Sequence, residues 1–382
     1  MQISIPCILM RGGTSKGVFF LEEDLPKSPA VRNEVIVRAF GSPDPSGRQI
    51  DGLGGGTSTT SKMAIISKRK EEVNGINYTF GQVDLKTSLV DMRGNCGNLS
   101  SAVGPYAIDM RLVDKIEEPY TKVRIYNTNT QKYIVAHVPT RNGKTLYDGD
   151  FQIAGVPGQG SKIQLDFMEP GGAVTGWLLP TGQPVEMINT DSYGSFQVSI
   201  VDAANPVVFV RAADIGLTGK ELPKDIDNNM QLLDKILQIR AAAAVRIGLA
   251  QDMQDAFVNV PSVPKVAFLS EPSDYITTSD AVVQKEEIDI MARMLSMGKM
   301  HPSFAITGSI CLAVACKIDG TLAHEMVPVD RRNNYELQIG HCSGAISVGA
   351  EVIQEQGTYR ALRGSVFRTA RRLMSGMVDV SI

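Results

Sequence analysis

One cysteine stands in a glycine-flanked turn within residues 91–102, which read Asp-Met-Arg-Gly-Asn-Cys-Gly-Asn-Leu-Ser-Ser-Ala. A stretch rich in β-forming residues precedes the turn, and residues 99–110 follow it with the apolar spacing of a helix. Cys96 is therefore expected at a helix start, where the free amides of Gly97 and Asn98 attract anions and favour a thiolate over a thiol. The pattern predicts an activated cysteine beside a carboxylate pocket, and the alternative is a small buried cysteine in a turn.

A lysine stands between a polar loop and an apolar strand. Residues 51–61 are rich in Gly, Thr and Ser, Lys62 follows them, and residues 63–67 read Met-Ala-Ile-Ile-Ser. A lysine at such a junction can be partly desolvated and then gives up its proton more readily. A phosphate-binding loop is excluded because its motif, GxxxxGK[ST], needs a glycine before the lysine. The alternative to a reactive Lys62 is a surface lysine at the start of a strand.

Residues 11–17, Arg-Gly-Gly-Thr-Ser-Lys-Gly, form a glycine-rich turn between two predicted strands, 3–10 and 18–21. Part of the turn matches the GxSxG pattern of serine hydrolases, but that nucleophile must open a helix, and a strand follows here. The turn is better suited to bind a carboxylate through Thr14, Ser15 and free backbone amides.

Composition excludes several classes of function. The chain has 382 residues, a hydrophobic content of 43% and a net charge of −3, which predicts two ordinary globular domains without a basic surface for nucleic acid. The 5 cysteines include no CxxC pair and the 4 histidines have no ligand spacing, which fits a reducing cytoplasm and argues against a structural zinc site. No cationic signal-peptide start is present, and the most apolar run, 302–316, is too short to span a bilayer.

Residues 169–182 are rich in glycine and proline and read as a domain junction. We therefore predict an α/β (α+β) protein in two domains. The first spans residues 1–175 and regains a C-terminal helix within 361–382, and the second spans 176–360.

Three longer helices are predicted. Residues 230–248 have an alanine-rich centre, and residues 283–297 are amphipathic, with Gly298 as the terminating glycine. Residues 362–377 place apolar side chains on one helical face. The arginines of this last segment are assigned to its solvated face: Arg363, Arg368, Arg371 and Arg372.

The second half carries polar residues in two places. His301 precedes an apolar helix, 310–315, although a lone histidine is commonly structural. Residues 335–340 form a strand that ends in His341-Cys-Ser-Gly. This ending resembles the Cys96 stretch in outline, because a strand is followed by small residues and a new element. The similarity predicts a duplicated fold with a cleft between the halves.

Several stretches together resemble one family, the allylic isomerases that include 2-methylaconitate isomerase, 3-methylitaconate Δ-isomerase and 4-oxalomesaconate tautomerase. The resemblance covers nearly the whole chain and rests on a set of motifs: Met-Arg-Gly-Gly-Thr-Ser-Lys-Gly (10–17), Asp-Gly-Leu-Gly-Gly-Gly (51–56), Thr-Ser-Lys (60–62), Gly-Asn-Cys-Gly-Asn (94–98), Gly-Pro (104–105), Asn-Thr-Asn (127–129), Asn-Pro (205–206), His301 and Gly-His-Cys-Ser-Gly (340–344). It implies the diaminopimelate epimerase fold, with two similar α/β halves and the active site in the cleft between them. It also implies that no organic cofactor and no metal are used.

By matching motifs, the resemblance implies that Lys62 and Cys96 form the catalytic pair. Further residues are expected to bind the substrate: Thr14, Ser15, Asn95, Gly97, Asn98, His301, Thr307, Ser343 and Gly344. The expected partner is a small-molecule carboxylate, held by groups from both halves as the cleft closes. Neither nucleic acid nor a membrane is expected as a partner, and a homo-oligomer is compatible with the sequence.

The implied reaction moves a C=C bond between adjacent carbons of an unsaturated di- or tricarboxylic acid, or interconverts its cis and trans isomers. A base must remove a weakly acidic proton, and positive charge must stabilise the allylic carbanion. In one assignment the Cys96 thiolate is the base and Lys62 holds the carboxylate. In the other, neutral Lys62 is the base and Cys96 assists, and the sequence leaves both open.

One departure from the family keeps other functions open. Where related isomerases commonly have His-Pro-Ser-Gly, this chain has His-Cys-Ser-Gly at 341–344. Diaminopimelate epimerases use two cysteines, one from each half, so Cys96 and Cys342 could serve a two-base amino-acid racemase or epimerase. The third alternative is a non-enzymatic carboxylate-binding protein, which would need neither Lys62 nor Cys96.

Overall fold

The structure is a computed structural model that describes residues 2–92, 96–296 and 298–381. Within these ranges no helix combines the length and the apolar character needed to cross a membrane. The same ranges contain no group of three or more His, Cys, Asp or Glu side chains that could hold a metal ion.

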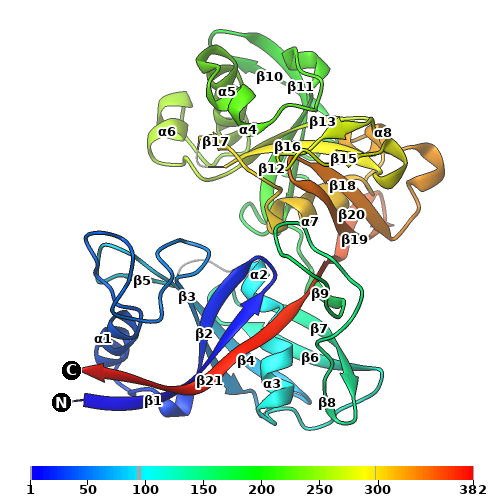
Figure 1. Cartoon of the computed structure of the whole chain (residues 1–382). Coiled ribbons are helices and arrows are strands. Elements are labelled where there is room, and N and C mark those ends of the chain that lie inside the picture. The colour runs from blue at the N-terminus through cyan, green and yellow to red at the C-terminus, as the bar shows by residue number, and fades with distance from the viewer. Residues whose placement is uncertain (1, 93–95, 297, 382) are drawn as a thin grey trace. The chain divides into compact units, whose positions relative to one another are not determined.

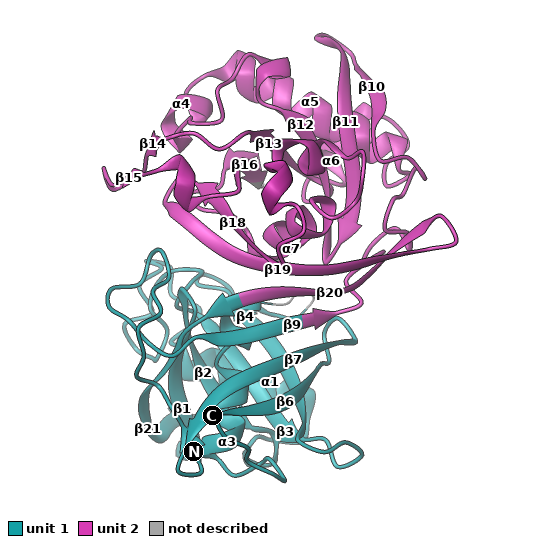
Figure 2. Ribbon diagram, turned by 90° about the vertical axis from the view of Figure 1, so that its right-hand side faces the viewer, with its two compact units in different colours: residues 1–166, 367–382 teal, residues 167–366 magenta. Residues whose placement is uncertain are grey.

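The chain divides into two compact units, which Figure 2 shows in different colours. Unit 1 comprises Met1–Asp166 and Phe367–Ile382, and unit 2 comprises Phe167–Val366. The chain passes into unit 2 within strand β9 and returns within strand β20, so the boundaries fall inside strands rather than at 175/176 and 360/361.

Unit 1 is built on a mixed sheet (Figure 1). Its strands pair in the order β21-β1-β2-β3-β4-β6-β7, with the pairs β2–β3 and β4–β6 parallel and the others antiparallel. The elements in chain order are β1 (Gln2–Gly12), β2 (Ser15–Leu21), η1 (Glu22–Asp24), α1 (Pro29–Ala39), β3 (Lys62–Lys68), β4 (Gly75–Val83), β5 (Val90–Asp91), α2 (Gly97–Ser100), α3 (Val103–Asp109), β6 (Tyr120–Asn127), β7 (Lys132–Arg141), β8 (Lys144–Thr145), β9 (Ile163–Met168) and β21 (Ala370–Ser381).

Helices cover both faces of this sheet. Neighbouring residues of a strand point to opposite faces, so β2 and β3 contribute to two separate layers of core. Phe19 of β2 packs against Tyr106 of α3, with ring centroids 5.3 Å apart. The other face packs on α1 through a buried cluster that includes Val18, Phe20, Val35, Ile36, Met63 and Ile65. The face that carries Phe19 is therefore the face covered by α2 and α3.

Unit 2 is also built on a mixed arrangement of parallel and antiparallel strands. Its strands pair in the order β10-β11-β12-β13-β16-β18-β19-β20, with the pairs β12–β13 and β16–β18 parallel. The elements are β10 (Glu186–Thr190), β11 (Gly194–Ala203), β12 (Asn205–Arg211), η2 (Ala213–Ile215), α4 (Pro223–Asp227), α5 (Met230–Arg246), α6 (Met253–Val258), β13 (Lys265–Ser270), β14 (Tyr275–Ile276), β15 (Val282–Val283), η3 (Lys285–Glu287), β16 (Ile290–Ser296), β17 (Lys299–Met300), α7 (Ile306–Ala315), α8 (Leu322–Met326), η4 (Val329–Arg331), β18 (Glu336–His341), β19 (Gly344–Glu355) and β20 (Thr358–Arg368).

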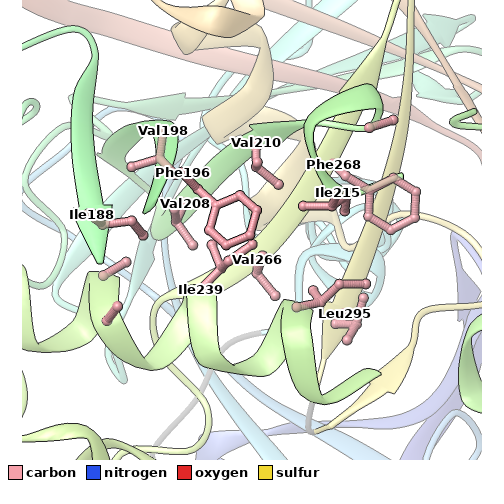
Figure 3. Packing of buried hydrophobic residues seen from close by; sticks show 14 of the residues in the cluster. Ile188, Phe196, Val198, Val208, Val210, Ile215, Ile239, Val266, Phe268 and Leu295 are labelled. Atoms are coloured by element: carbon pink, nitrogen blue, oxygen red, sulfur yellow. The ribbon is translucent and has the colours of Figure 1, made fainter. Parts of the chain in front are cut away.

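The main core of unit 2 lies between α5 and its sheet (Figure 3). Asn229 caps the start of α5 by accepting a hydrogen bond from Leu232 N, and Gly248, with φ of 73°, follows its end. Helix α7 covers the other face, because a Cβ on Gly308 would lie 2.4 Å from Met294 Cε of β16. The residues facing α5 alternate along the strands and include Val198, Ile200, Val208, Val210, Val266 and Phe268.

The two units repeat one connectivity. In each, an antiparallel hairpin (β1–β2, β11–β12) is followed by a helix on one face (α1, α5) and by a strand parallel to the second hairpin strand (β3, β13). An antiparallel strand (β4, β16), a helical segment on the other face (α2–α3, α7) and a final antiparallel pair (β6–β7, β18–β19) complete each unit. The predicted duplication is therefore present.

The segments that correspond in the two units differ from those that the sequence suggested. The counterpart of the Cys96 stretch is the segment that enters α7, because both open the helical segment between the fourth strand and the final strand pair. The turn at 341–344 joins β18 to β19, so its counterpart is the turn after Asn127 that joins β6 to β7. The likeness between the Cys96 stretch and 341–344 was therefore misleading.

Two predicted helices are strands. The predicted helix at 283–297 contains β16, a central strand between β13 and β18 whose residues 290–295 are all buried. A strand covered on both faces lacks polar alternation and cannot be told from a helix by periodicity. Gly298, with φ of 75°, lies between β16 and β17 rather than after a helix.

The predicted C-terminal helix at 362–377 consists of parts of β20 and β21. Its apolar residues recur at intervals of four, except for the interval of three between Ala370 and Leu373, and intervals of four fit the face of a strand as well as that of a helix. Leu373 and Met377 are 43% and 55% exposed, so they do not contribute to a buried face.

Candidate active site

The β1–β2 turn packs against the start of α2. Gly13 has φ of 52°, and a Cβ at this position would lie 2.2 Å from Asn98 Oδ1, so both the conformation and the space require glycine. Thr14 N donates to Asn98 Oδ1 over 3.4 Å, and Ser15 Oγ lies 3.8 Å from Cys96 Sγ. The predicted carboxylate-binding turn is therefore brought to the cysteine.

Cys96 is the N-cap of α2, with φ of −116° and ψ of 98°. Its sulfur accepts a hydrogen bond from Leu99 N over 3.4 Å, and the residue is half-buried with a free thiol. Tyr78 lies nearby, and burial, followed by the charge of the Cys96 sulfur, raises the pKa of its phenol. Cys96 thus occupies the predicted helix start and is only partly buried.

Lys62 is the first residue of β3, where it pairs with Gly17 of β2 and Gln82 of β4. Its Nζ donates to Gln82 Oε1 over 2.6 Å and lies 5.2 Å from the centroid of the Phe80 ring. The Gln82 amide is fixed in turn, because its Nε2 donates to Ser61 O over 2.9 Å. An amide oxygen and an aromatic face both stabilise an ammonium.

Lys62 and Cys96 belong to the same side of the unit 1 sheet. A Cβ on Gly17 would lie 2.9 Å from Leu99 Cδ1, so α2 packs on the strand residue that pairs with Lys62. Gly97, at the first position of α2, is buried in this contact region, whereas Asn95 lies outside the described residues. Cys96 and Ser15 therefore lie together at the start of α2, and Lys62 belongs to the sheet face that α2 covers.

Arg368, the last residue of β20, is a functional candidate that the sequence reasoning missed. Its side chain is buried, and its Nε donates to Asn98 Oδ1 over 3.2 Å while Nη1 donates to Phe367 O over 2.8 Å. Burial lowers the pKa of this guanidinium to about 10. The earlier assignment to a solvated helical face was wrong, because in a strand Arg368 shares a face with the buried Val366.

In unit 2, His301 follows β17 and is half-buried. Its backbone N donates to Met294 O over 2.8 Å, and its Nδ1 accepts from Ser303 N over 3.1 Å. Because Nδ1 is the acceptor, the proton of the neutral ring is on Nε2. Burial, followed by the charge of Lys265, lowers the pKa of His301, so at neutral pH the ring is an uncharged donor.

The other predicted residues of unit 2 lie on two elements. Ser343 Oγ donates to Pro302 O, which joins the 341–344 turn to the His301 segment. Gly344 has φ of 132°, and its carbonyl accepts from Tyr275 Oη over 2.5 Å. Thr307 is half-buried in the first turn of α7. The structure therefore connects His301 with Ser343 inside unit 2.

Cys342 does not resemble Cys96 in its surroundings. It is fully buried and belongs to the hydrophobic cluster beneath α5, on the face opposite α7. Burial raises the pKa of its thiol. The residue that matches Cys96 in the duplicated fold is Ala305, the N-cap of α7. Unit 2 therefore has no thiol at the position that would serve a second base.

Comparison with known proteins identifies the family to which the chain belongs. Residues 2–381 match the PrpF protein family. The chain belongs to the PrpF family. A relative from Eubacterium barkeri, 3-methylitaconate isomerase, is 41% identical over 99% of this chain and 98% of the relative. The 2-methyl-aconitate isomerase of Shewanella oneidensis is 38% identical over 99% of this chain and 97% of the relative. The named relatives of this PrpF protein are thus isomerases.

Solved structures agree with this membership. A methylitaconate-delta-isomerase superposes with a TM-score of 0.91 at 41% identity, covering 99% of this chain and 96% of the other. A hydroxyproline epimerase from Agrobacterium vitis gives a TM-score of 0.50 at 14% identity, covering 98% and 92%. The second likeness concerns the fold alone, and it places the PrpF chain in the α/β fold shared with racemases and epimerases, as the sequence predicted.

Proposed function

We propose that this PrpF-family protein is a cofactor-independent isomerase that shifts a C=C bond in an unsaturated di- or tricarboxylic acid. Methylitaconate, methylaconitate and oxalomesaconate are the substrates to test first. The proposal is supported by the position of Cys96 at the start of α2 and of Lys62 on the sheet face that α2 covers, with Ala305 at the position of unit 2 that matches Cys96. One acid–base group is what a proton transfer that starts and ends on the same substrate requires.

The reaction follows from these groups. A base removes a proton from the allylic carbon, and the electron pair delocalises through the double bond onto a carboxylate. The protonated base, whose proton exchanges with solvent, then delivers a proton two carbons away, so the double bond moves and the composition of the substrate is unchanged. Lys62 supplies the positive charge that stabilises the carbanion, and its hydrogen bond to Gln82 holds that charge in place.

The contacts of Lys62 favour Cys96 as the base. The ammonium form of Lys62 can donate to Gln82 Oε1 and interact with the Phe80 ring, and both interactions would weaken in the neutral amine. Cys96 in turn has a backbone donor and the Ser15 hydroxyl near its sulfur. We therefore assign proton transfer to Cys96 and charge stabilisation to Lys62.

The two-base racemase alternative receives less support. It needs a second thiol that reaches the substrate, whereas Cys342 is fully buried in the core beneath α5. A purely carboxylate-binding protein would need neither a half-buried thiol nor a positioned lysine. The 5 cysteines are free, which supports the further proposal that the enzyme works in a reducing cytoplasm.

Incubation of the protein with each acid in deuterated water tests the proposal. An isomerase yields product with the double bond moved and with deuterium at an allylic carbon, which NMR detects. A racemase would instead label the stereocentre of an amino acid and leave the unsaturated acids unchanged. Absence of both product and label for every acid would contradict the proposal.

A further inference from the structure

Tyr78 of β4 carries a fully buried hydroxyl in unit 1, the unit that also contains Cys96. We propose that Tyr78 is a positioning residue whose hydroxyl donates a hydrogen bond to the Cys96 sulfur when that sulfur is a thiolate. The inference rests on the proposed function and extends it, because it explains how the base assigned to the reaction is kept in its reactive form.

The strand register places Tyr78 on the side of the sheet that carries α2 and α3. Tyr78 pairs with Ile66, and Gln82 pairs with Lys62, so the two pairs are four positions apart along both strands. Residues separated by an even number of positions point to the same face of a strand, and directly opposed residues share that face. Tyr78 and Lys62 therefore lie on one face, the face covered by the helix that Cys96 caps.

The side of α2 that carries the Cys96 side chain is turned toward this phenol. Cys96 and Ser100 are four residues apart, a spacing that brings two side chains to one side of a helical turn. Ser100 Oγ donates to Cys96 O over 2.9 Å. After burial, the Cys96 sulfur and the Ser100 hydroxyl are the groups that act on the pKa of Tyr78, the first raising it and the second lowering it. Tyr78 therefore lies near both ends of this short helix.

The Tyr78 hydroxyl is a donor without an acceptor in the part of the chain that the structure describes. Its Oη is buried and has no hydrogen-bond partner there, so Ser100 Oγ lies near it but outside hydrogen-bonding geometry. Buried polar groups are nearly always paired, and an unpaired donor costs free energy. An anion that forms beside the hydroxyl removes this cost. The Cys96 thiolate is such an anion, whereas the neutral thiol is a weak acceptor.

Tyr78 can act only as a donor. Burial, followed by the charge of the Cys96 sulfur, raises the pKa of the phenol well above its ordinary value. The phenol therefore keeps its proton while Cys96 loses and regains one, and Tyr78 takes no part in the transfer itself. Its hydrogen bond favours the thiolate over the thiol and so increases the fraction of Cys96 that can act as a base.

Other groups also act on Cys96, and they stay the same when only the phenol hydroxyl is removed. Leu99 N donates to Cys96 Sγ over 3.4 Å, and Ser15 Oγ lies 3.8 Å from the same atom. Lys62 of β3 and Arg368 of β20 bring positive charge to this part of unit 1. A change in the reactivity of Cys96 on loss of the phenol hydroxyl therefore reports on that hydroxyl.

The test is the rate of alkylation of Cys96 by iodoacetamide as a function of pH, in the absence of substrate. Cys96 is half-buried and the other four cysteines are buried, so the reagent reacts mainly at Cys96, which peptide mass spectrometry checks. In Tyr78→Phe the midpoint of the profile should rise by about one pH unit, so the rate below both midpoints falls on the order of 10-fold. Above both midpoints the two rates should be similar, because the thiol is then ionised in both proteins.

Tyr106→Phe is the matched control. Tyr106 of α3 is also buried, and its ring packs on Phe19 of the same sheet face. After burial, the charge that acts most on its phenol is that of Asp24. The substitution removes the same atom as Tyr78→Phe and should leave the alkylation profile unchanged. An unchanged profile in Tyr78→Phe, or an equal shift in both variants, would overturn the inference.

A fluorinated tyrosine should shift the profile in the opposite direction and keeps the inference testable if Tyr78→Phe does not fold. 3-Fluorotyrosine at position 78 retains the ring and the hydroxyl, and its more acidic proton makes it a stronger donor. The midpoint of alkylation should then fall below that of the intact protein. A midpoint that is unchanged or higher would contradict the role of Tyr78 as a donor.

The alkylation profile does not depend on turnover, which separates this inference from the proposed function. A shifted profile in a protein that isomerises no acid would support the role of Tyr78 and contradict the function. In an active enzyme, Tyr78→Phe should lower kcat/KM below the midpoint of its pH profile and change it little above that midpoint. An equal loss at every pH would show that the hydroxyl has only a structural role, and would overturn the inference.

Discussion

Units 1 and 2 have the same strand connectivity and differ at the positions where chemistry is possible. The first residue of the second hairpin strand is Ser15 in unit 1 and Asn205 in unit 2. The strand parallel to it begins with a lysine in both units, whereas the helix N-cap is Cys96 in one and Ala305 in the other. The two units thus share a lysine at the start of this strand, whereas only unit 1 has a thiol at the N-cap of the helix.

The difference between Cys96 in unit 1 and Ala305 in unit 2 shows how one fold can serve two kinds of proton transfer. A racemase needs an acid and a base on opposite sides of a stereocentre, so it needs a reactive group from each half. A shift of a double bond returns the proton to the same substrate, and one group can do both steps. The asymmetry between Cys96 and Ala305 matches the second requirement.

The largest effect that tests this comparison is expected for Lys62→Ala. It removes either the base or the counter-charge of the carbanion, so activity should fall by roughly 10³-fold or more. Lys68→Ala, at the other end of β3, is the control, because Lys68 is exposed and forms an ion pair with Asp114. Steady-state kinetics of both variants measures the loss. Full activity in Lys62→Ala would contradict the assignment of Lys62 to the catalytic site.

A smaller effect is expected for Arg368→Gln. Loss of the guanidinium removes one of the two donors to Asn98 Oδ1 in the first turn of α2, the other being Thr14 N, so kcat should fall on the order of 10- to 100-fold. Arg240→Gln is the counterpart in unit 2: Arg240 is also buried, and its Nη2 donates to Ala256 O over 2.7 Å. Both variants should lose stability, about 1.5–3 kcal/mol for a hydrogen bond to a charged group, but only Arg368→Gln should lose kcat. Equal kcat in the two variants would contradict a positioning role.

The smallest predicted effect concerns His301 and pH. Its pKa is lowered in the folded protein, so below its unfolded value of about 6.5 the unfolded state takes up the proton first. The free energy of unfolding therefore decreases as the pH falls from about 6.5 to the pKa of His301 in the folded protein. The decrease is about 1.4 kcal/mol for each pH unit between these two pKa values. Urea unfolding at pH 7.5 and 5.5 should show a larger loss for the intact protein than for His301→Gln. An identical loss in both would show that His301 does not titrate in this way.

Local features of the site could be predicted from the sequence because they depend on near neighbours. Cys96 at a helix start and Lys62 at a strand start follow from the adjoining residues, and the structure has both. The contact between Asn98 and Arg368 joins residues 270 positions apart and could not be predicted from local patterns. β16 was mistaken for a helix because both of its faces are buried, a property of the assembled sheet. The correspondence of Cys96 with Ala305 became visible only with the strand order.

The most direct test of the central claim is the rate of deuterium incorporation by Cys96→Ser compared with that by Cys342→Ala. Serine is nearly isosteric with cysteine but too weakly acidic to act as an anion at neutral pH. The account predicts a loss of roughly 10²–10⁴-fold in Cys96→Ser, the contribution of a positioned acid–base group. It predicts that Cys342→Ala retains its activity, because Cys342 is a buried core residue. Full activity in Cys96→Ser, or an equal loss in Cys342→Ala, would contradict the claim that one thiol in unit 1 transfers the proton.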